Sequence, residues 1–186
     1  MGEETWVKVS TADGQIGYVL KDFLEPVSGP FASAQNEIVC YTAKHQAIES
    51  DSPILINRDF LQSVEKMEEL AAAHSINLTV TSSFRNPKVQ LRNTVVVPSN
   101  MSNHHVGHAL DVNFLYKGKL YGCSSFTDRC GPPSEVCRFI REVKKTVPSI
   151  RWGGDFTVPD YIHFDDGLNV TNPQQFLTKL HKYWLD

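Results

Sequence analysis

Apolar residues recur with a helical period in three stretches of the chain, at 58–74, 134–147 and 173–185. In each stretch the apolar side chains fall three or four positions apart, which places them on one face of a helix. Asn57 precedes the first stretch as an N-cap, Ser134 caps the second, and Pro148 follows it. The third stretch begins "TNP", a capping residue followed by proline at the first helical position.

Between these helices lie shorter runs that are typical of strands, at 76–84, 93–98, 109–116 and 162–166. Strands between separated helices, without regular β-α alternation, predict an α+β fold with a central antiparallel sheet and flanking helices. In the run from 109, alternation places Leu110, Val112 and Phe114 toward the core. Asp111 then lies on the opposite face, near the start of its strand.

The first residues form a separate pattern. "WVKVSTADGQIGYVL" reads as two strands joined by a turn at Asp13-Gly14, which predicts a β-hairpin. Together with the following "DFLEP", it resembles the C-terminal half of a bacterial-type SH3 domain. The alternative is a hairpin that extends the sheet of the main domain. We therefore expect a hairpin segment at 1–26, a linker and lead-in at 27–49, and a main domain at 50–186.

Composition narrows the class of partner. The 186 residues are 41% hydrophobic and 21% charged, with a net charge of −3. This balance gives no reason to expect nucleic acid or an anionic membrane surface as a partner. No apolar run approaches the ~20 residues of a membrane span, and the chain does not open with a signal-peptide pattern. We expect a monomer.

The chain contains four cysteines, Cys40, Cys123, Cys130 and Cys137, without a C-x-x-C pair. A disulfide could close the polar segment "CSSFTDRC" (123–130), so we expect a Cys123–Cys130 bridge and a secreted or extracellular protein, from which a leader could have been removed. The alternative is a set of buried free thiols.

The segment "SNHHVGHALDVNF" (102–114) holds three of the seven histidines. His104 and His108 are four residues apart and could bind a metal from one helical face. Against this, Gly107 is a poor helix residue and a strand pattern follows at once. The preferred interpretation takes His104 from the loop and Asp111 from the strand as two ligands of a zinc ion.

A third ligand comes from "DYIHF" (160–164), where His163 lies in a strand-like run. Asp160, three residues earlier, can face a metal-bound water instead of the metal. Three protein ligands and one water form the arrangement of a catalytic zinc site. One Zn²⁺ per chain is therefore expected.

Three motifs carry a resemblance to a known family. The D-alanyl-D-alanine carboxypeptidase-like zinc peptidases have zinc and substrate motifs that are similar to three segments of this chain: "SSFR" (82–85), "SNHHVGHALD" (102–111) and "DYIHF" (160–164). The three segments follow one another in the same order as in that family. The resemblance covers roughly residues 50–186. It implies that His104, Asp111 and His163 are zinc ligands, that Asp160 is the catalytic acid/base, and that Arg85 binds substrate or the oxyanion.

The resemblance also implies a substrate. D-x-x-H preceded by "WGGDF" is similar to the L-alanyl-D-glutamate endopeptidase branch, so we expect cleavage of that bond in peptidoglycan stem peptides. The alternatives are a D-alanyl-D-alanine carboxypeptidase or dipeptidase, and a non-catalytic zinc-binding signalling or binding domain. Ser102, His108 and Trp152 are candidate substrate-binding residues, although Trp152 could equally belong to the core.

The remaining aspartates and histidines are expected to have structural roles or to lie on the surface. Asp155 and Asp165 are expected to brace turns or loops. His105 is expected in solvent or behind the ligands. The other histidines, His45, His74 and His181, are expected on the surface.

Overall fold

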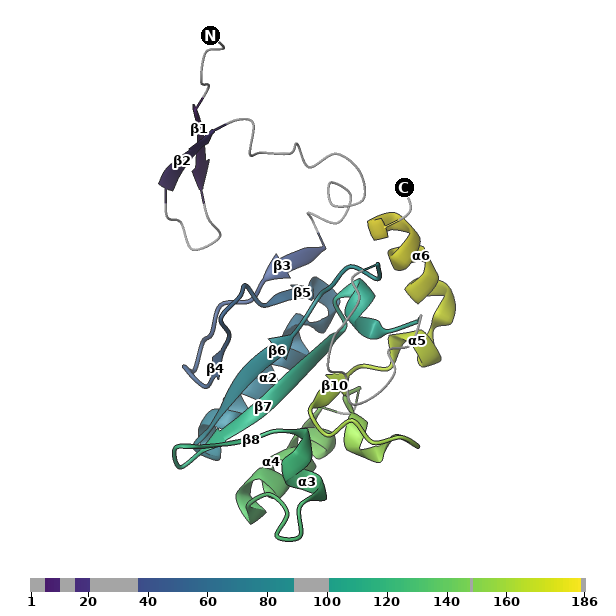
Figure 1. The fold of residues 1–186 in the computed structure, drawn as a ribbon. Coiled ribbons are helices and arrows are strands. Elements are labelled where there is room, and N and C mark those ends of the chain that lie inside the picture. The colour runs from purple at the N-terminus through teal and green to yellow at the C-terminus, as the bar shows by residue number, and fades with distance from the viewer. Residues whose placement is uncertain (1–5, 11–15, 21–36, 89–100, 148, 185–186) are drawn as a thin grey trace.

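A computed structural model describes residues 6–10, 16–20, 37–88, 101–147 and 149–184. Its central sheet has six strands, in the order β4-β6-β7-β10-β9, with β8 paired to β7 (Figure 1). The bounds of these strands are Ile48–Glu49 (β4), Ile76–Ser82 (β6), Ala109–Tyr116 (β7), Lys119–Tyr121 (β8), Arg151–Trp152 (β9) and His163–Asp165 (β10). A second, two-stranded sheet pairs β3 (Ile38–Cys40) with β5 (Leu55–Asn57).

The central sheet is mostly antiparallel. Only β4 and β6 run parallel, while β6, β8 and β10 each pair with β7 in the antiparallel sense. The predicted α+β fold is therefore confirmed. The alternation along β7 is confirmed as well, because Leu110, Val112 and Phe114 are fully buried. Ala109 is also fully buried, whereas Asp111, Asn113 and Leu115 keep partial exposure on the opposite face.

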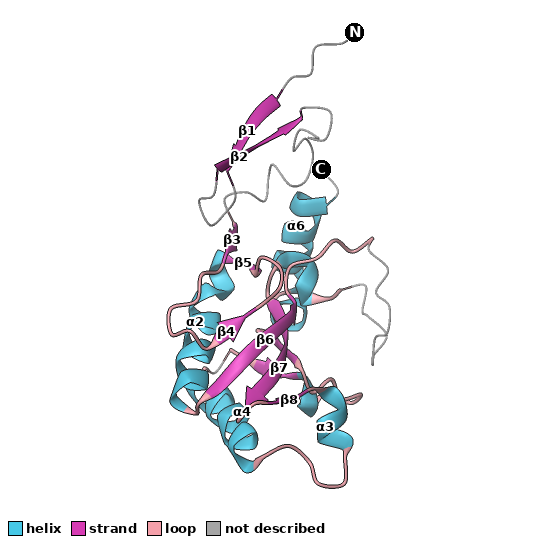
Figure 2. Cartoon of the chain, turned by 60° about the vertical axis from the view of Figure 1, so that its left-hand side comes forward, coloured by secondary structure: helices cyan, strands magenta, loops and turns pink. Residues whose placement is uncertain are grey.

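Two helices, α2 (Arg58–Ala73) and α4 (Ser134–Thr146), cover one face of this sheet (Figure 2). Their apolar faces join Leu78, Phe114 and Phe164 in one hydrophobic core. The other helices in the described residues are α3 (Cys123–Thr127), α5 (Leu168–Thr171) and α6 (Pro173–Trp184). Within the described part of the chain, no helix has the length and apolar character that a bilayer crossing requires.

The predicted helix starts are confirmed at two of three places. The Asn57 side chain accepts a hydrogen bond from the Asp59 amide, and Asn172 accepts one from the amide of Gln175 in α6. At α4 the cap prediction is wrong, because Pro133 occupies the N-cap position and Ser134 already has helical backbone. Pro148 lies outside the described residues.

The N-terminal strands also match the prediction. Residues Trp6–Ser10 (β1) and Ile16–Leu20 (β2) pair in antiparallel register as a sheet of their own. In the described residues this pair does not join the six-stranded sheet, which argues against the alternative of a sheet extension. The likeness to an SH3 domain and the domain boundaries stay predictions. The turn at 13–14 and the strand predicted at 93–98 lie outside the described residues.

The predicted Cys123–Cys130 disulfide is not present. All four cysteines fall within the described residues, and each is a free thiol. The segment expected to be a loop begins as a helix instead, with Cys123 in its first turn, whereas Cys130 lies beyond its end. The cysteines are half-buried or exposed, so they do not match the alternative of fully buried thiols either.

His74, expected on the surface, connects α2 to α4. Its Nδ1 lies 2.6 Å from the Glu135 carboxylate and its Nε2 lies 2.8 Å from that of Glu142. Burial alone lowers the pKa of His74, but the two glutamates outweigh it and raise that pKa above its usual value. A protonated imidazole can donate to both carboxylates, which makes this contact dependent on pH.

We expect His74→Gln to destabilise the protein more at about pH 6 than at about pH 9. A histidine whose folded-state pKa is raised contributes stability below its unfolded-state pKa, and this contribution is lost as pH rises through the folded-state pKa. Thermal melts of wild type and variant at both pH values measure the difference in Tm. His45→Gln, at an exposed histidine, is the control. A Tm difference that does not change with pH would contradict the expectation.

Candidate metal centre

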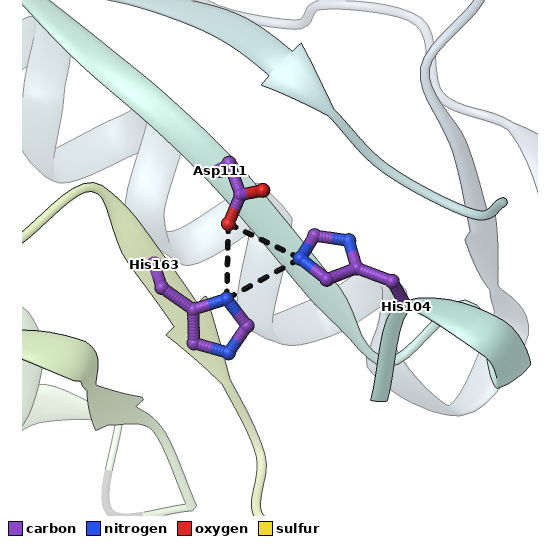
Figure 3. Close-up of side chains that lie close together, drawn as sticks. All are labelled: His104, Asp111 and His163. Atoms are coloured by element: carbon purple, nitrogen blue, oxygen red, sulfur yellow. Dashed lines mark hydrogen bonds and ion pairs between the residues drawn. The ribbon is translucent and has the colours of Figure 1, made fainter. Parts of the chain in front are cut away.

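Three polar side chains from separate segments converge beside the sheet (Figure 3). His104 belongs to a short 3-10 helix, η2 (Asn103–Val106), Asp111 to β7, and His163 is the first residue of β10. The antiparallel register places His163 directly opposite Asp111. Pairing of two strands therefore brings together side chains that are 52 positions apart in the sequence.

One donor atom of each side chain points to a common centre. Nε2 of His104 lies 3.1 Å from Oδ1 of Asp111 and 3.3 Å from Nδ1 of His163. The third side of this triangle, from Nδ1 of His163 to Oδ1 of Asp111, is 2.9 Å. Among the His, Cys, Asp and Glu side chains of the described residues, these three form the group whose donor atoms lie close enough together to hold a metal ion.

The outward-facing nitrogen of each histidine has its own partner. Nδ1 of His104 donates to the Ser83 carbonyl at 2.8 Å, since a carbonyl can only accept. Nε2 of His163 lies 3.0 Å from the carboxylate of Asp165. Such partners fix the orientation of a metal-binding imidazole and leave the other nitrogen for the metal.

The group is electrostatically coupled. Burial alone raises the pKa of Asp111, but His104 and His163 outweigh it and hold that pKa well below its usual range. Burial lowers the pKa of His163, whereas its bonds to Asp111 and Asp165 raise it to about 9. Asp111 is therefore ionised at neutral pH, as a metal ligand must be.

Arg85 lies beside this group. Its Nη1 donates to Oγ of Ser82 at 2.8 Å and lies 3.6 Å from Oδ2 of Asp111. Burial lowers the pKa of the guanidinium, and the negative charges of Asp111 and Asp160 oppose that effect. The arrangement supplies a cation next to the metal group.

The backbone around Asp160 is held close to His163. The Asp160 amide donates to the Gly153 carbonyl at 2.9 Å, and the His163 amide donates to the Asp160 carbonyl at 3.1 Å. A Cβ at Gly153 would lie 2.3 Å from the Asp160 carbonyl oxygen, so this approach requires glycine. Burial first, and then the negative charge of Asp111, raise the pKa of the Asp160 carboxyl above its usual value.

The predicted substrate-binding residues are not all brought to the group. Ser102 is close to it, because its Oγ accepts from Nη2 of Arg85 at 3.5 Å. Trp152 is half-buried against the core, and its indole N–H donates to the Tyr161 carbonyl. His108 does not join the group: it is buried, and its Nδ1 lies 2.6 Å from the Asp166 carboxylate. His108 therefore lies outside the metal group, and its contact with substrate stays a prediction.

Three further residues have structural interpretations, and the structure describes each of them. His105, expected in solvent or behind the ligands, is buried, and its carbonyl accepts from the Trp184 indole of α6. Asp155 is exposed and forms an ion pair with Lys144, which fits a loop-bracing role. Asp165 is almost fully buried against His163, so its role is larger than the bracing of a turn.

Gly107 ends the 3-10 helix that carries His104. Its φ of 76° lies in the left-handed region, which residues with a Cβ adopt only at a cost. A Cβ here would also lie 2.7 Å from the Asn57 backbone nitrogen, which donates to the Gly107 carbonyl. The glycine therefore allows η2 to approach β5.

We expect Gly107→Ala to destabilise the protein clearly more than Gly118→Ala. Both glycines have a positive φ, but a Cβ at Gly118 would meet no atom within 4 Å. Gly118→Ala should thus cost only the conformational term, about 1–2 kcal/mol, while Gly107→Ala adds a steric one. Urea denaturation of both variants measures the free energies of unfolding, and equal losses would contradict the predicted clash.

A comparison with known protein families identifies the segment that holds this group. Residues 97–166 match the family described as D-alanyl-D-alanine carboxypeptidase. The predicted resemblance is confirmed. The matched segment contains the whole His-Asp-His group and Asp160, and it supports a hydrolase of the metallopeptidase type.

Among solved structures, the chain is similar to the crystal structure of the L-Ala D-Glu endopeptidase ChiX of Serratia marcescens. The sequence identity is 16% and the TM-score is 0.40, over 59% of this chain and 79% of ChiX. No curated protein matches the sequence.

Proposed function

We propose that this protein is a zinc-dependent peptidase that hydrolyses the stem peptide of peptidoglycan. The observation that carries the proposal is the convergence of the His104, Asp111 and His163 donor atoms, with Asp160 three residues before His163. The family match of the same segment supports a peptidase.

The donor set fits zinc. Two imidazole nitrogens and one carboxylate oxygen are ligands that zinc accepts in catalytic sites, where a fourth position stays open. Ligands at 2.0–2.1 Å from a tetrahedral zinc lie about 3.3 Å from one another. The three observed separations, 2.9, 3.1 and 3.3 Å, are close to that value.

A zinc ion at this centre would supply a Lewis acid that polarises the scissile carbonyl and lowers the pKa of water. Asp160 takes a proton from the water that attacks the carbonyl carbon, and it gives a proton to the leaving amine as the C–N bond breaks. Its raised pKa suits both transfers, because it lies closer to neutral pH than that of an ordinary aspartate.

Arg85 is proposed to stabilise the negative charge that develops on the carbonyl oxygen. Its guanidinium lies next to Asp111 and donates to Ser82 and Ser102, which hold it in place. Loss of such a donor typically costs about 10²–10³ in rate. We propose that Ser102 acts by orienting Arg85, and that Trp152 supports the backbone of Tyr161 next to Asp160.

The proposed partner is the bacterial cell wall, and the proposed location is therefore extracellular. We propose the L-alanyl-D-glutamate bond as the bond cleaved, on the D-x-x-H element and the preceding "WGGDF". A carboxypeptidase is the second candidate, favoured by the description of the matched family and by Arg85, which could bind a terminal carboxylate.

Digestion of purified peptidoglycan, with mass spectrometry of the new ends, tests the function. We expect new L-alanine carboxyl ends and D-glutamate amino ends with the zinc-loaded protein, and none after the metal is removed with a chelator. Release of free D-alanine, with L-alanyl-D-glutamate bonds intact, would replace the endopeptidase by the carboxypeptidase. A zinc-loaded protein that releases no ends would favour a non-catalytic binding domain.

A further inference from the structure

A buried carboxylate lies directly behind the metal group. Asp165 is the last residue of β10 and is only 2% exposed. Its two oxygens accept hydrogen bonds from four surrounding residues: Arg151 (Nε at 2.7 Å and Nη2 at 2.8 Å), His163 (Nε2 at 3.0 Å), Asn103 (Nδ2 at 3.1 Å) and the Gly167 amide at 3.0 Å. An ionised group is this deeply buried only when its charge is compensated.

Arg151 supplies that compensation. It binds both oxygens of Asp165 in a two-pronged arrangement, which fixes the plane of the carboxylate. Its Nη2 also donates to Asn169, and Asn169 accepts a further bond from Asn103. The position of the Asp165 carboxylate is therefore set from several sides and not by His163 alone.

The bond from His163 to Asp165 determines which nitrogen of the imidazole faces the centre. With Nε2 held by Asp165, Nδ1 is directed toward His104 and Asp111. A rotated ring would give up this bond and leave a buried carboxylate with one donor fewer. The arrangement thus favours a single orientation of His163.

The same carboxylate also reaches the segment that carries His104. Asn103, immediately before His104, donates to Asp165, and its own side-chain oxygen accepts from the Asn169 amide. Asp165 consequently contacts both β10 and η2, which provide the two histidines of the group.

We propose that Asp165, held by Arg151, is a positioning residue of the metal centre, which selects Nδ1 of His163 as the metal-binding nitrogen and ties the two histidine-bearing segments together. The inference rests on the proposed zinc site and extends it from the ligands to the residues that orient them.

Zinc affinity of Asp165→Asn, measured by competition with a chromogenic chelator, tests the proposal. The amide cannot accept from Arg151, His163 and Asn103 together, so His163 loses its fixed orientation. We expect the Kd for zinc to rise about 10–100-fold. We also expect the visible absorption of the Co²⁺-substituted variant to differ from that of wild type. The matched control is Asp166→Asn, at the neighbouring carboxylate that pairs with His108 and does not contact His163; its affinity and spectrum should remain unchanged.

The possible results separate this inference from the function on which it rests. A wild-type protein that binds no zinc would defeat the proposed metal centre, and the positioning role with it. A folded Asp165→Asn with wild-type zinc affinity and cobalt spectrum would overturn the positioning role alone. If Asp165→Asn does not fold, Arg151→Gln replaces it: this variant keeps the carboxylate but removes the two-pronged contact. It should bind zinc several-fold more weakly, and wild-type affinity there would equally overturn the proposal.

Discussion

Replacing Asp160 with alanine is expected to leave one zinc ion per chain while lowering peptidase activity by about 10²–10⁴-fold or more. Asp160 is not among the three converging donors, so the metal should remain. Its carboxyl lies close enough to Asp111 for that charge to raise its pKa, which places it beside the centre where the proton must be transferred. Metal analysis and rates of stem-peptide hydrolysis on the same preparation measure both effects.

Asp155→Ala is the matched control for this variant. Asp155 is an aspartate of the same connection between β9 and β10, but it is exposed and pairs with Lys144 instead. It should keep both zinc and activity. Near-normal hydrolysis by Asp160→Ala would assign the proton transfer to another group. Loss of zinc from that variant would instead make Asp160 part of the metal-binding set.

His104→Ala is expected to lose the zinc ion and much of the stability that zinc provides. His104 is almost fully buried and contributes one of only three protein donors. A ligand that binds only the folded state at 100 times its Kd stabilises that state by about 2.7 kcal/mol. Thermal melts should therefore show a lower Tm for the variant in zinc, and its Tm should not respond to a chelator.

The Tm of the wild-type protein should fall when the chelator is added. The Tm of His45→Ala should fall in the same way, because this variant changes an exposed histidine outside the group. Stoichiometric zinc in purified His104→Ala would remove His104 from the ligand set. If the wild-type protein binds zinc but its Tm does not change when the chelator removes the metal, the metal does not stabilise the fold.

Much of the site could be predicted because it depends on local patterns. The period of two along residues 109–116 gave both the strand and the side of the sheet to which Asp111 belongs. The motif around His163 predicted a second strand, and antiparallel pairing of the two strands then places His163 opposite Asp111. Helix positions followed from apolar periodicity, and at α2 and α6 from the capping residues as well.

Asp165 could have been recognised from the same alternation. Residues 163 and 165 lie on one face of β10, so a carboxylate two positions after a predicted ligand is a natural partner for its ring. The burial of His105 and His108 could not be predicted in this way. It depends on contacts with segments distant in sequence, such as the bond from Trp184 to the His105 carbonyl and that between His108 and Asp166.

The contacts of α6 have a consequence for the order in which the protein is made. When the ribosome adds Asp165, all three donor residues have already been synthesised. The contacts between α6 and the segment that carries His104 cannot yet have formed. Trp184 then donates to the His105 carbonyl, while Asn57 bonds both the Val106 carbonyl and the Tyr183 hydroxyl. Because two of these bonds involve Tyr183 and Trp184, the nascent chain gains those two only after the last turn of α6 has emerged. The ligands are thus made early, and the structure that holds them is completed late.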